Sequence, residues 1–150
     1  MRLTIKRSVL KQTILAVGWV VVFVPRVHAQ QCLHGSEEAA DQQQRRRQAL
    51  NAVRAVNTLQ ANQAGAAQKK YLRQEELATE LAKIPFAGSR PEWIEQLKFA
   101  RGEEVLPGWG LELDLAMDGY WVMIKDKNDP CGFAFISNES GLIYTAQPIR

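Results

Sequence analysis

The sequence predicts an α+β protein: a long N-terminal helix and short helices packed on a four-stranded antiparallel meander sheet. Between residues 49 and 100, apolar side chains recur at helical spacing. From Trp109 onward they alternate with polar side chains, as in strands. Short turn sequences separate these strand-like segments, and short connections join antiparallel neighbours.

The long helix is expected to start at residues 36–38 (Ser-Glu-Glu), where a capping hydroxyl is followed by acids in the first turn. Residues 37–63 contain no Gly or Pro. An apolar stripe is present only in the second half, at Leu50, Val53, Val56 and Leu59. We therefore expect the second half to pack on a core and the first half to project into water or meet a partner.

Two shorter helices are expected next. The first covers residues 67–83 and ends at Ile84-Pro85. The second starts at Ser89, which with Glu92 forms a capping-box pattern, and runs to about Ala100.

The remaining chain reads as strands joined by turns. Asp118-Gly119 is a strong hairpin signal between the first two strands. The four expected strands cover residues 109–117, 120–125, 131–136 and 142–146.

The start of the chain is typical of an export signal. Residues 1–12 carry four bases and no acid, and residues 13–24 are apolar apart from one threonine. Residues 27–29 (Val-His-Ala) match the small-x-Ala cleavage pattern, so we expect cleavage after Ala29, with Gln30 as the first mature residue. The alternative is a retained membrane anchor, which needs about 20 apolar residues. We expect a periplasmic or secreted protein that meets the membrane only transiently, through its signal.

Loss of the signal would change the net charge. The whole chain has 19 Lys and Arg residues against 16 Asp and Glu residues, a net charge of +3. Residues 1–29 hold five of these bases and no acid, which leaves 14 bases against 16 acids, a net charge of −2. Charge therefore gives no argument for nucleic-acid binding. The rest suits one domain: residues 30–48 as an exposed segment with the start of the long helix, and residues 49–150 as the globular part.

Cys32 and Cys131 both lie in the expected mature chain. Two cysteines in an oxidising compartment are expected to pair. This bridge would close a loop of about 100 residues, worth about 4–5 kcal/mol in the chain-entropy model. Two free thiols are the alternative.

No set of residues in the sequence demands a reaction. His34 is the single histidine of the mature chain, and near the end of that chain we expect it to be a solvated residue rather than a catalytic base. One histidine and two distant cysteines do not supply the three or four ligands of a zinc site. We therefore expect no metal, no cofactor and no catalytic residue.

Three further groups allow two interpretations each. The acids at 103–104, 126 and 129 could be paired carboxylates or calcium ligands, but polar turns explain them more simply. Arg45, Arg46 and Arg47 could form a partner surface or a solvated helix face. The tryptophans could form a ligand platform or belong to the core; they are Trp93, Trp109 and Trp121.

The order of these segments resembles the globular headpiece of type IV pilins and pseudopilins. Residues 49–63 (ALNAVRAVNTLQANQ) are similar to their Ala/Val/Arg-rich helix, and residues 71–77 contain the Tyr-Leu and Glu-Glu-Leu that follow it. Residues 132–150 (GFAFISNESGLIYTAQPIR) are similar to their closing aromatic strand, Gly-containing turn and last strand. The resemblance covers residues 49–150. The prepilin leader glycine and the glutamate after it are missing, which suggests a soluble pilin-like domain.

The resemblance implies a non-enzymatic exported protein that acts through protein–protein contacts, in a secretion- or pilus-associated or periplasmic structural role. The polar first half of the long helix, with Arg45, Arg46 and Arg47, is the expected partner surface. The alternative is a small periplasmic ligand-binding or inhibitor module that uses the tryptophans. A hydrolase is a third hypothesis.

Overall fold

The computed structural model describes residues 32–35, 37–65, 70–86 and 88–147. The predicted signal, with its cleavage site at Ala29 and Gln30, lies outside these ranges. The described elements are α1 (Ala40–Gly65), α2 (Gln74–Lys83), α3 (Glu92–Glu95), β1 (Glu104–Leu106), β2 (Trp109–Leu115), β3 (Tyr120–Asp126), β4 (Ala134–Asn138) and β5 (Ile143–Ala146). Within this part of the chain, no helix has the length and apolar character needed to cross a bilayer.

The strands form one antiparallel meander in the order β1-β2-β3-β4-β5. The α+β class and the meander are confirmed, but the prediction of four strands is wrong, because β1 precedes the other four. β1 has three residues and an irregular register with β2, so it is too short to show an alternating pattern. The hairpin at Asp118-Gly119 is present, with Leu115 opposite Tyr120.

β4 begins three residues later than predicted, at Ala134 instead of Cys131. The Asp129 carboxylate accepts the backbone N–H groups of Cys131 and Phe133, and Gly132 between them has a φ of 69°. These interactions hold residues 129–133 in a loop. The backbone groups of this loop are therefore satisfied without strand pairing.

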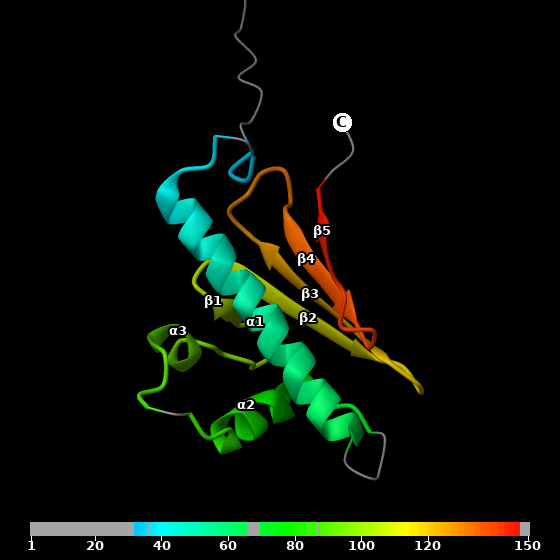
Figure 1. The fold of residues 1–150 in the computed structure, drawn as a ribbon. Helices are drawn as coiled ribbons and strands as arrows, with labels where there is room; N and C mark the ends of the chain where they lie inside the picture. The colour runs from blue at the N-terminus through cyan, green and yellow to red at the C-terminus, as the bar shows by residue number, and fades with distance from the viewer. Residues whose placement is uncertain (1–31, 36, 66–69, 87, 148–150) are drawn as a thin grey trace, which may run out of the picture.

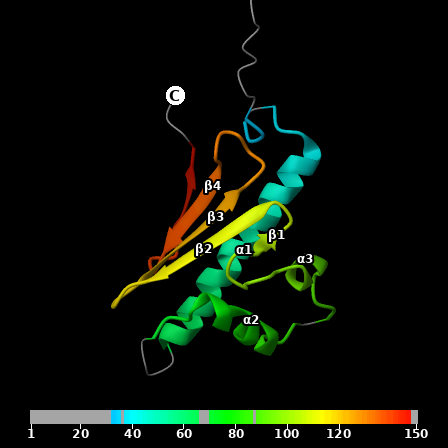
Figure 2. The same cartoon turned by 180° about the vertical axis from the view of Figure 1, so that it is seen from behind.

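α1 crosses one face of the sheet and packs on β3 and β4 (Figure 1). The opposite face of the sheet carries no helix among the described elements (Figure 2). The predicted stripe of α1 is confirmed, since Val53 and Val56 are fully buried against the core that also contains Val122 and Ile124. Burial of each such side chain contributes about 1.5–3 kcal/mol.

All three helices begin later than predicted. α1 starts at Ala40 because the carboxylate of Glu38, expected in the first turn, binds the side chains of His34 and Arg46 instead. α2 starts at Gln74, and the residues expected before it at 70–73 are not helical.

α3 has only four residues, and the predicted capping box at Ser89 does not form. Its capping position is occupied by Pro91, without a side-chain hydrogen bond. The backbone N–H of Lys98 donates to the carbonyl of Val105, 3.1 Å away. This bond belongs to the approach to β1, so the chain leaves the helix before the predicted end.

Gln60 of α1 binds the backbone of the segment that precedes α2. Its side chain is fully buried; Nε2 donates to the carbonyl of Leu72 at 2.9 Å, and Oε1 accepts the N–H of Leu72 at 2.7 Å. Both backbone groups of Leu72 are thus satisfied by one side chain. An unpaired buried backbone group costs about 1–3 kcal/mol.

Replacing Gln60 by alanine should lower the free energy of unfolding by about 2–4 kcal/mol, because both backbone groups of Leu72 lose their partner. Urea unfolding followed by tryptophan fluorescence measures the change. The matched control is Gln63→Ala at a half-buried position of the same helix, expected to stay within about 0.5 kcal/mol of the parent. Equal effects of the two variants would contradict the role given to Gln60.

Candidate functional site

A disulfide joins Cys32 to Cys131, with 5.3 Å between their Cα atoms. The predicted pairing is therefore confirmed, and the two cysteines are not free thiols. The bridge brings residues 32–35 against the loop between β3 and β4. Leu33 reinforces this contact, because its N–H donates to Oδ1 of Asp129 at 2.9 Å.

His34 follows the bridge and is buried, with 4% of its surface exposed. The prediction of a solvated histidine is wrong, because the disulfide draws the segment into the molecule. The ring lies against Phe133 and Trp109, with centroids 4.3 and 5.6 Å from theirs. Its position is thus fixed by aromatic packing as well as by charge.

Both ring nitrogens of His34 face carboxylates. Nδ1 lies 2.6 Å from Oε1 of Glu38, and Nε2 lies 2.9 Å from Oδ2 of Asp126. An ionised carboxylate only accepts hydrogen bonds, and a neutral imidazole has one N–H. Two ionised partners therefore require a doubly protonated ring. In this arrangement no nitrogen is left to take a proton from a nucleophile or to bind a metal.

Two arginines complete the cluster. Arg46 Nη2 lies 2.9 Å from Oε2 of Glu38, and Arg45 Nη2 lies 3.7 Å from Oδ1 of Asp126. Arg45 also passes close to Gly108, whose φ is 81°: a Cβ there would lie 2.5 Å from Arg45 Nη2. The left-handed conformation of the β1–β2 turn favours glycine here.

Asp129, in the loop after β3, is also buried. Burial alone would raise the pKa of its carboxyl, but the N–H groups of Leu33, Phe133 and Cys131 and the charge of His34 lower it more, so the pKa falls below its ordinary value of 3.8. Asp126 accepts the N–H of Asn128 at 2.8 Å in addition to His34. The oxygens of both acids are thus used inside the protein, as in a structured turn. Among the described residues, no group of three or more His, Cys, Asp or Glu could hold a metal ion.

A signal for this cluster was present in the sequence. Along β3, Tyr120, Val122, Ile124 and Asp126 occupy alternate positions on the buried face. A carboxylate at an inward position needs a partner, because burial of an unpaired charge is costly. His34 and Glu38, four residues apart, supplied an obvious candidate.

The tryptophans are not brought together. Trp109 is in the core, Trp93 on α3 packs against the core from another side, and Trp121 lies on the opposite face of the sheet, 38% exposed. Of the carboxylates at 103–104, Glu104 accepts the N–H of Gly108 and lies 3.7 Å from Lys127 Nζ. These contacts fit a structural turn.

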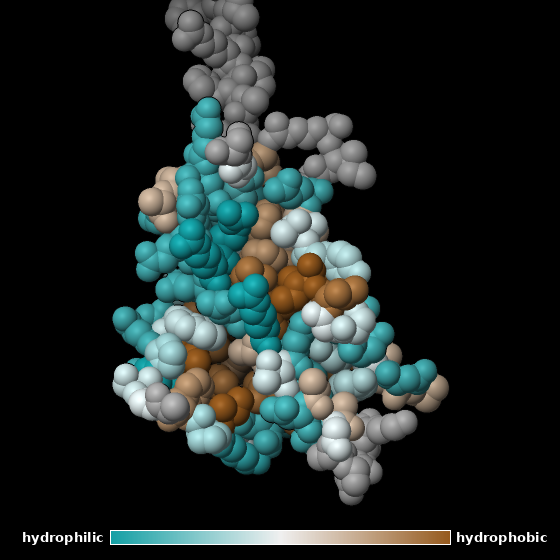
Figure 3. All heavy atoms as spheres, viewed as in Figure 1, coloured by the Kyte–Doolittle hydropathy of each residue, from teal (hydrophilic) through white to brown (hydrophobic). Residues whose placement is uncertain are grey.

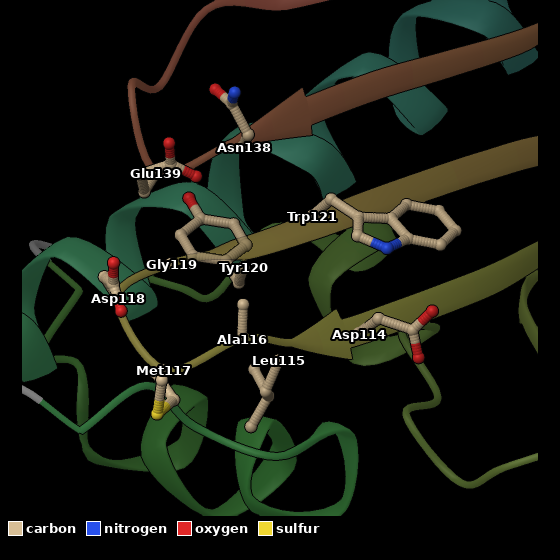
Figure 4. Close-up of a pocket in the computed structure, with 10 residues that line it drawn as sticks. All are labelled: Asp114, Leu115, Ala116, Met117, Asp118, Gly119, Tyr120, Trp121, Asn138 and Glu139. Carbon is tan, nitrogen blue, oxygen red and sulfur yellow. The ribbon is translucent and has the colours of Figure 1, made fainter.

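A hollow of about 630 Å³ lies at the tip of the β2–β3 hairpin (Figure 4). Its side chains point in different directions: Trp121 and Asp114 along the strands, Leu115 and Met117 outward from the turn. Met117 is 98% exposed. The hollow is an open surface, with the Tyr120 hydroxyl and the Glu139 carboxylate on one side of it (Figure 4).

A groove of about 450 Å³ lies between the N-terminal half of α1 and the last two strands. It is lined by Arg46, Arg47, Leu50 and Arg54 of α1, Phe135 of β4, and Ile143 and Thr145 of β5. In Figure 3 an apolar area lies beside a band of hydrophilic side chains, on the face that shows α1 and β5. The groove thus combines an apolar floor with three guanidinium groups along one wall.

Hydrogen bonds close one end of this groove. Asn57 Nδ2 donates to Ser137 Oγ at 2.8 Å, and Tyr120 donates its hydroxyl to Asn57 Oδ1 at 3.0 Å. Burial, with added repulsion from Tyr71 and Glu139, raises the pKa of Tyr120 to about 12, so the hydroxyl keeps its proton at neutral pH. α1 is fastened to the sheet here, and α1 and β5 diverge from this point (Figure 1).

The three predicted partner residues thus lie in two environments. Arg46 and Arg47 line the groove, whereas Arg45 reaches the buried cluster beside Asp126. Arg54, Leu50 and Ile143, which complete the groove, were not assigned from the sequence. Arg54 follows Arg47 by seven residues, two turns of helix, which is the signal that could have found it.

Comparison with protein-family models, with curated proteins and with solved structures gives no match to this chain.

Replacing His34 by glutamine should lower the free energy of unfolding by about 3–5 kcal/mol, because the buried carboxylates of Glu38 and Asp126 both lose the ring that they share. Urea unfolding measures the change. The control is Glu37→Gln, an exposed acid beside the cluster, expected to stay within about 0.5 kcal/mol of the parent. A loss below about 1 kcal/mol for the His34 variant would contradict the charged arrangement.

Asp129 should make the stability of the fold depend on pH. A carboxyl whose folded pKa is lowered stabilises the fold above its unfolded pKa, and this contribution is lost as pH falls through the folded pKa. Asp129→Asn should therefore be less stable than the parent at pH 7, and the difference should shrink below pH 3.8. Urea unfolding between pH 7 and pH 2 measures both curves. Parallel curves over the whole range would refute this role.

Proposed function

We propose that the chain is an exported, non-enzymatic protein of pilin-like layout that acts by binding another protein. The observation that carries this proposal is the groove between α1 and β5, with its apolar floor and its arginine wall. The disulfide supports export, since such bridges persist in oxidising compartments. The N-terminal sequence, with its basic, apolar and small-x-Ala parts, points to the same route.

The charges of the groove favour a protein partner with acidic side chains. No ion pair of Arg47 is found among the described residues, and the only hydrogen bond of the Arg54 guanidinium there goes to the amide oxygen of Asn51, at 3.1 Å. Arg46 also lines the groove, but its guanidinium is already paired with Glu38. Guanidinium groups bind carboxylates with two parallel hydrogen bonds, and arginine is enriched where proteins meet. A positive groove on a mature chain of net charge −2 is therefore a local feature suited to recognition.

The buried cluster supports a role without catalysis. The two nitrogens of His34 are occupied by Glu38 and Asp126, so this side chain has a structural role in the described fold. An aromatic ligand platform is not favoured, since Trp109 is buried and Trp121 lies on the far face of the sheet. Binding of a protein through the groove needs none of these residues to react.

The proposal is tested by placing a photo-activated crosslinking amino acid at Leu50 in cells that produce the protein. We expect one major protein adduct, which the added change Arg47→Glu should reduce at least fivefold, and mass spectrometry identifies it. The same crosslinker at Lys70, an exposed position outside the groove, is the matched control and should give no such adduct. Adducts of equal yield from both positions, or none from Leu50, would refute the groove as the binding surface.

A further inference from the structure

The last strand of the sheet has an open edge. β5 pairs with β4 through four residue pairs, and no strand pairs with its other edge among the described residues. Its sequence, Ile-Tyr-Thr-Ala, contains neither lysine nor proline, the residues that commonly protect such edges. An unprotected edge is a template on which an extended peptide can form main-chain hydrogen bonds.

This open edge borders the groove. Thr145 is opposite Phe135 and Ile143 is opposite Ser137, so both β5 side chains face the side of the sheet that α1 covers. α1 lies over β3 and β4 and diverges from β5 toward its own N-terminus (Figure 1). A strand added beside β5 would therefore point alternate side chains to the same side, toward the arginine wall.

The arginine wall has a simple order. Arg47, Leu50 and Arg54 are spaced by three and then four residues, so they share one helix face with the apolar side chain between two cations. The two arginines are about 10 Å apart along the helix axis. In a strand, residues i and i+4 are about 13 Å apart and point to the same side, with i+2 between them. Long arginine side chains can accommodate the difference.

We infer that the groove takes an extended acidic segment of a partner protein, in the pattern acid-x-apolar-x-acid, added as a sixth strand to the edge of β5. The two acids bind Arg47 and Arg54, and the apolar side chain packs on Leu50 and Ile143. The intervening residues point to the opposite face, where Tyr144 is 57% exposed. Lipids and nucleic acids lack the peptide groups that the edge of β5 would pair with. This inference rests on the proposed function and adds the chemistry of the partner.

The probe is the labelled peptide Thr-Glu-Thr-Val-Thr-Glu-Thr, measured by fluorescence anisotropy against the oxidised protein made from the full chain. We expect saturable binding, weakened at least tenfold by Arg47→Glu and by Arg54→Glu. The control Lys70→Glu makes the same charge change outside the groove and should alter the affinity less than twofold. Tyr144→Ser, on the other face of β5, should also alter the affinity less than twofold.

Two peptide series separate strand addition from attraction between charges. Moving the acids together, in Glu-Glu-Thr-Thr-Val-Thr-Thr, should cost at least tenfold in affinity. N-methylation of single peptide bonds should weaken binding at every second position, because alternate N–H groups of an added strand face β5. Equal affinity for the rearranged peptide, or equal effects at all N-methylated positions, would overturn the inference.

The two proposals fail in different ways. Absence of peptide binding together with a groove-specific adduct at Leu50 would overturn the strand-addition inference and leave the protein-binding function in place. Peptide binding that Tyr144→Ser abolishes and the arginine variants leave unchanged would place the contact on the open sheet face, and would overturn the inference as well.

Discussion

The anchoring of the N-terminal segment on the β3–β4 loop is the constraint on which the arrangement of α1 depends. The disulfide joins two cysteines that are 99 residues apart in the sequence. It brings His34 into the molecule, where the ring lies between two carboxylates. The cluster contains three carboxylates, those of Glu38, Asp126 and Asp129. When the His34 ring is doubly protonated, it also contains three cations, since Arg45 and Arg46 are the other two. Buried charges are tolerated when they are paired and hydrogen-bonded. His34, Glu38 and Asp126 meet this condition, whereas Arg45 Nη2 is buried 3.7 Å from Asp126 Oδ1 and has no hydrogen-bond partner among the described residues.

This anchoring fixes the direction of α1 from its N-terminal end. Glu38 accepts from His34 and from Arg46, so the first turns of the helix are held against the end of β3, which carries Asp126. At the middle of α1, Asn57 binds the sheet through Ser137. A helix held at these two points crosses β3 and β4 at one angle and leaves β5 uncovered. The groove is thus a consequence of where the helix is fastened, and its arginines belong to the half that the cluster holds.

The general architecture could be predicted from the sequence because its determinants are local. The Val53–Val56 stripe, the alternation in β2 and β3 and the turn at Asp118-Gly119 all act within a few residues, and the structure contains each of them. The candidate disulfide needed only the count of cysteines. The short strand β1 was missed because three residues carry no readable period.

The predictions failed where hydrogen bonds of single side chains, and not hydrophobic periodicity, decide the local structure. The late start of β4 depends on the carboxylate of Asp129, which holds the backbone of Cys131 and Phe133 in a loop. The burial of His34 depends on a bridge to the other end of the chain and on Asp126, 92 residues away. The contact of His34 with Asp126 has no signature within a sequence window, although the inward position of Asp126 in its strand indicated that a partner was needed.

The same reasoning explains why the arginines at 45, 46 and 47 could be singled out but not told apart. Successive residues of a helix point about 100° from one another, so three in a row cannot share one surface. Arg45 turns toward Asp126, Arg46 divides its contacts between Glu38 and the groove, and Arg47 faces the groove. The position of the sheet decides which of the three side chains faces the groove. Because β5 is the last strand and α1 does not cover it, the open direction is the one that meets an unpaired strand edge, and this coincidence is what makes the groove suited to an extended acidic chain.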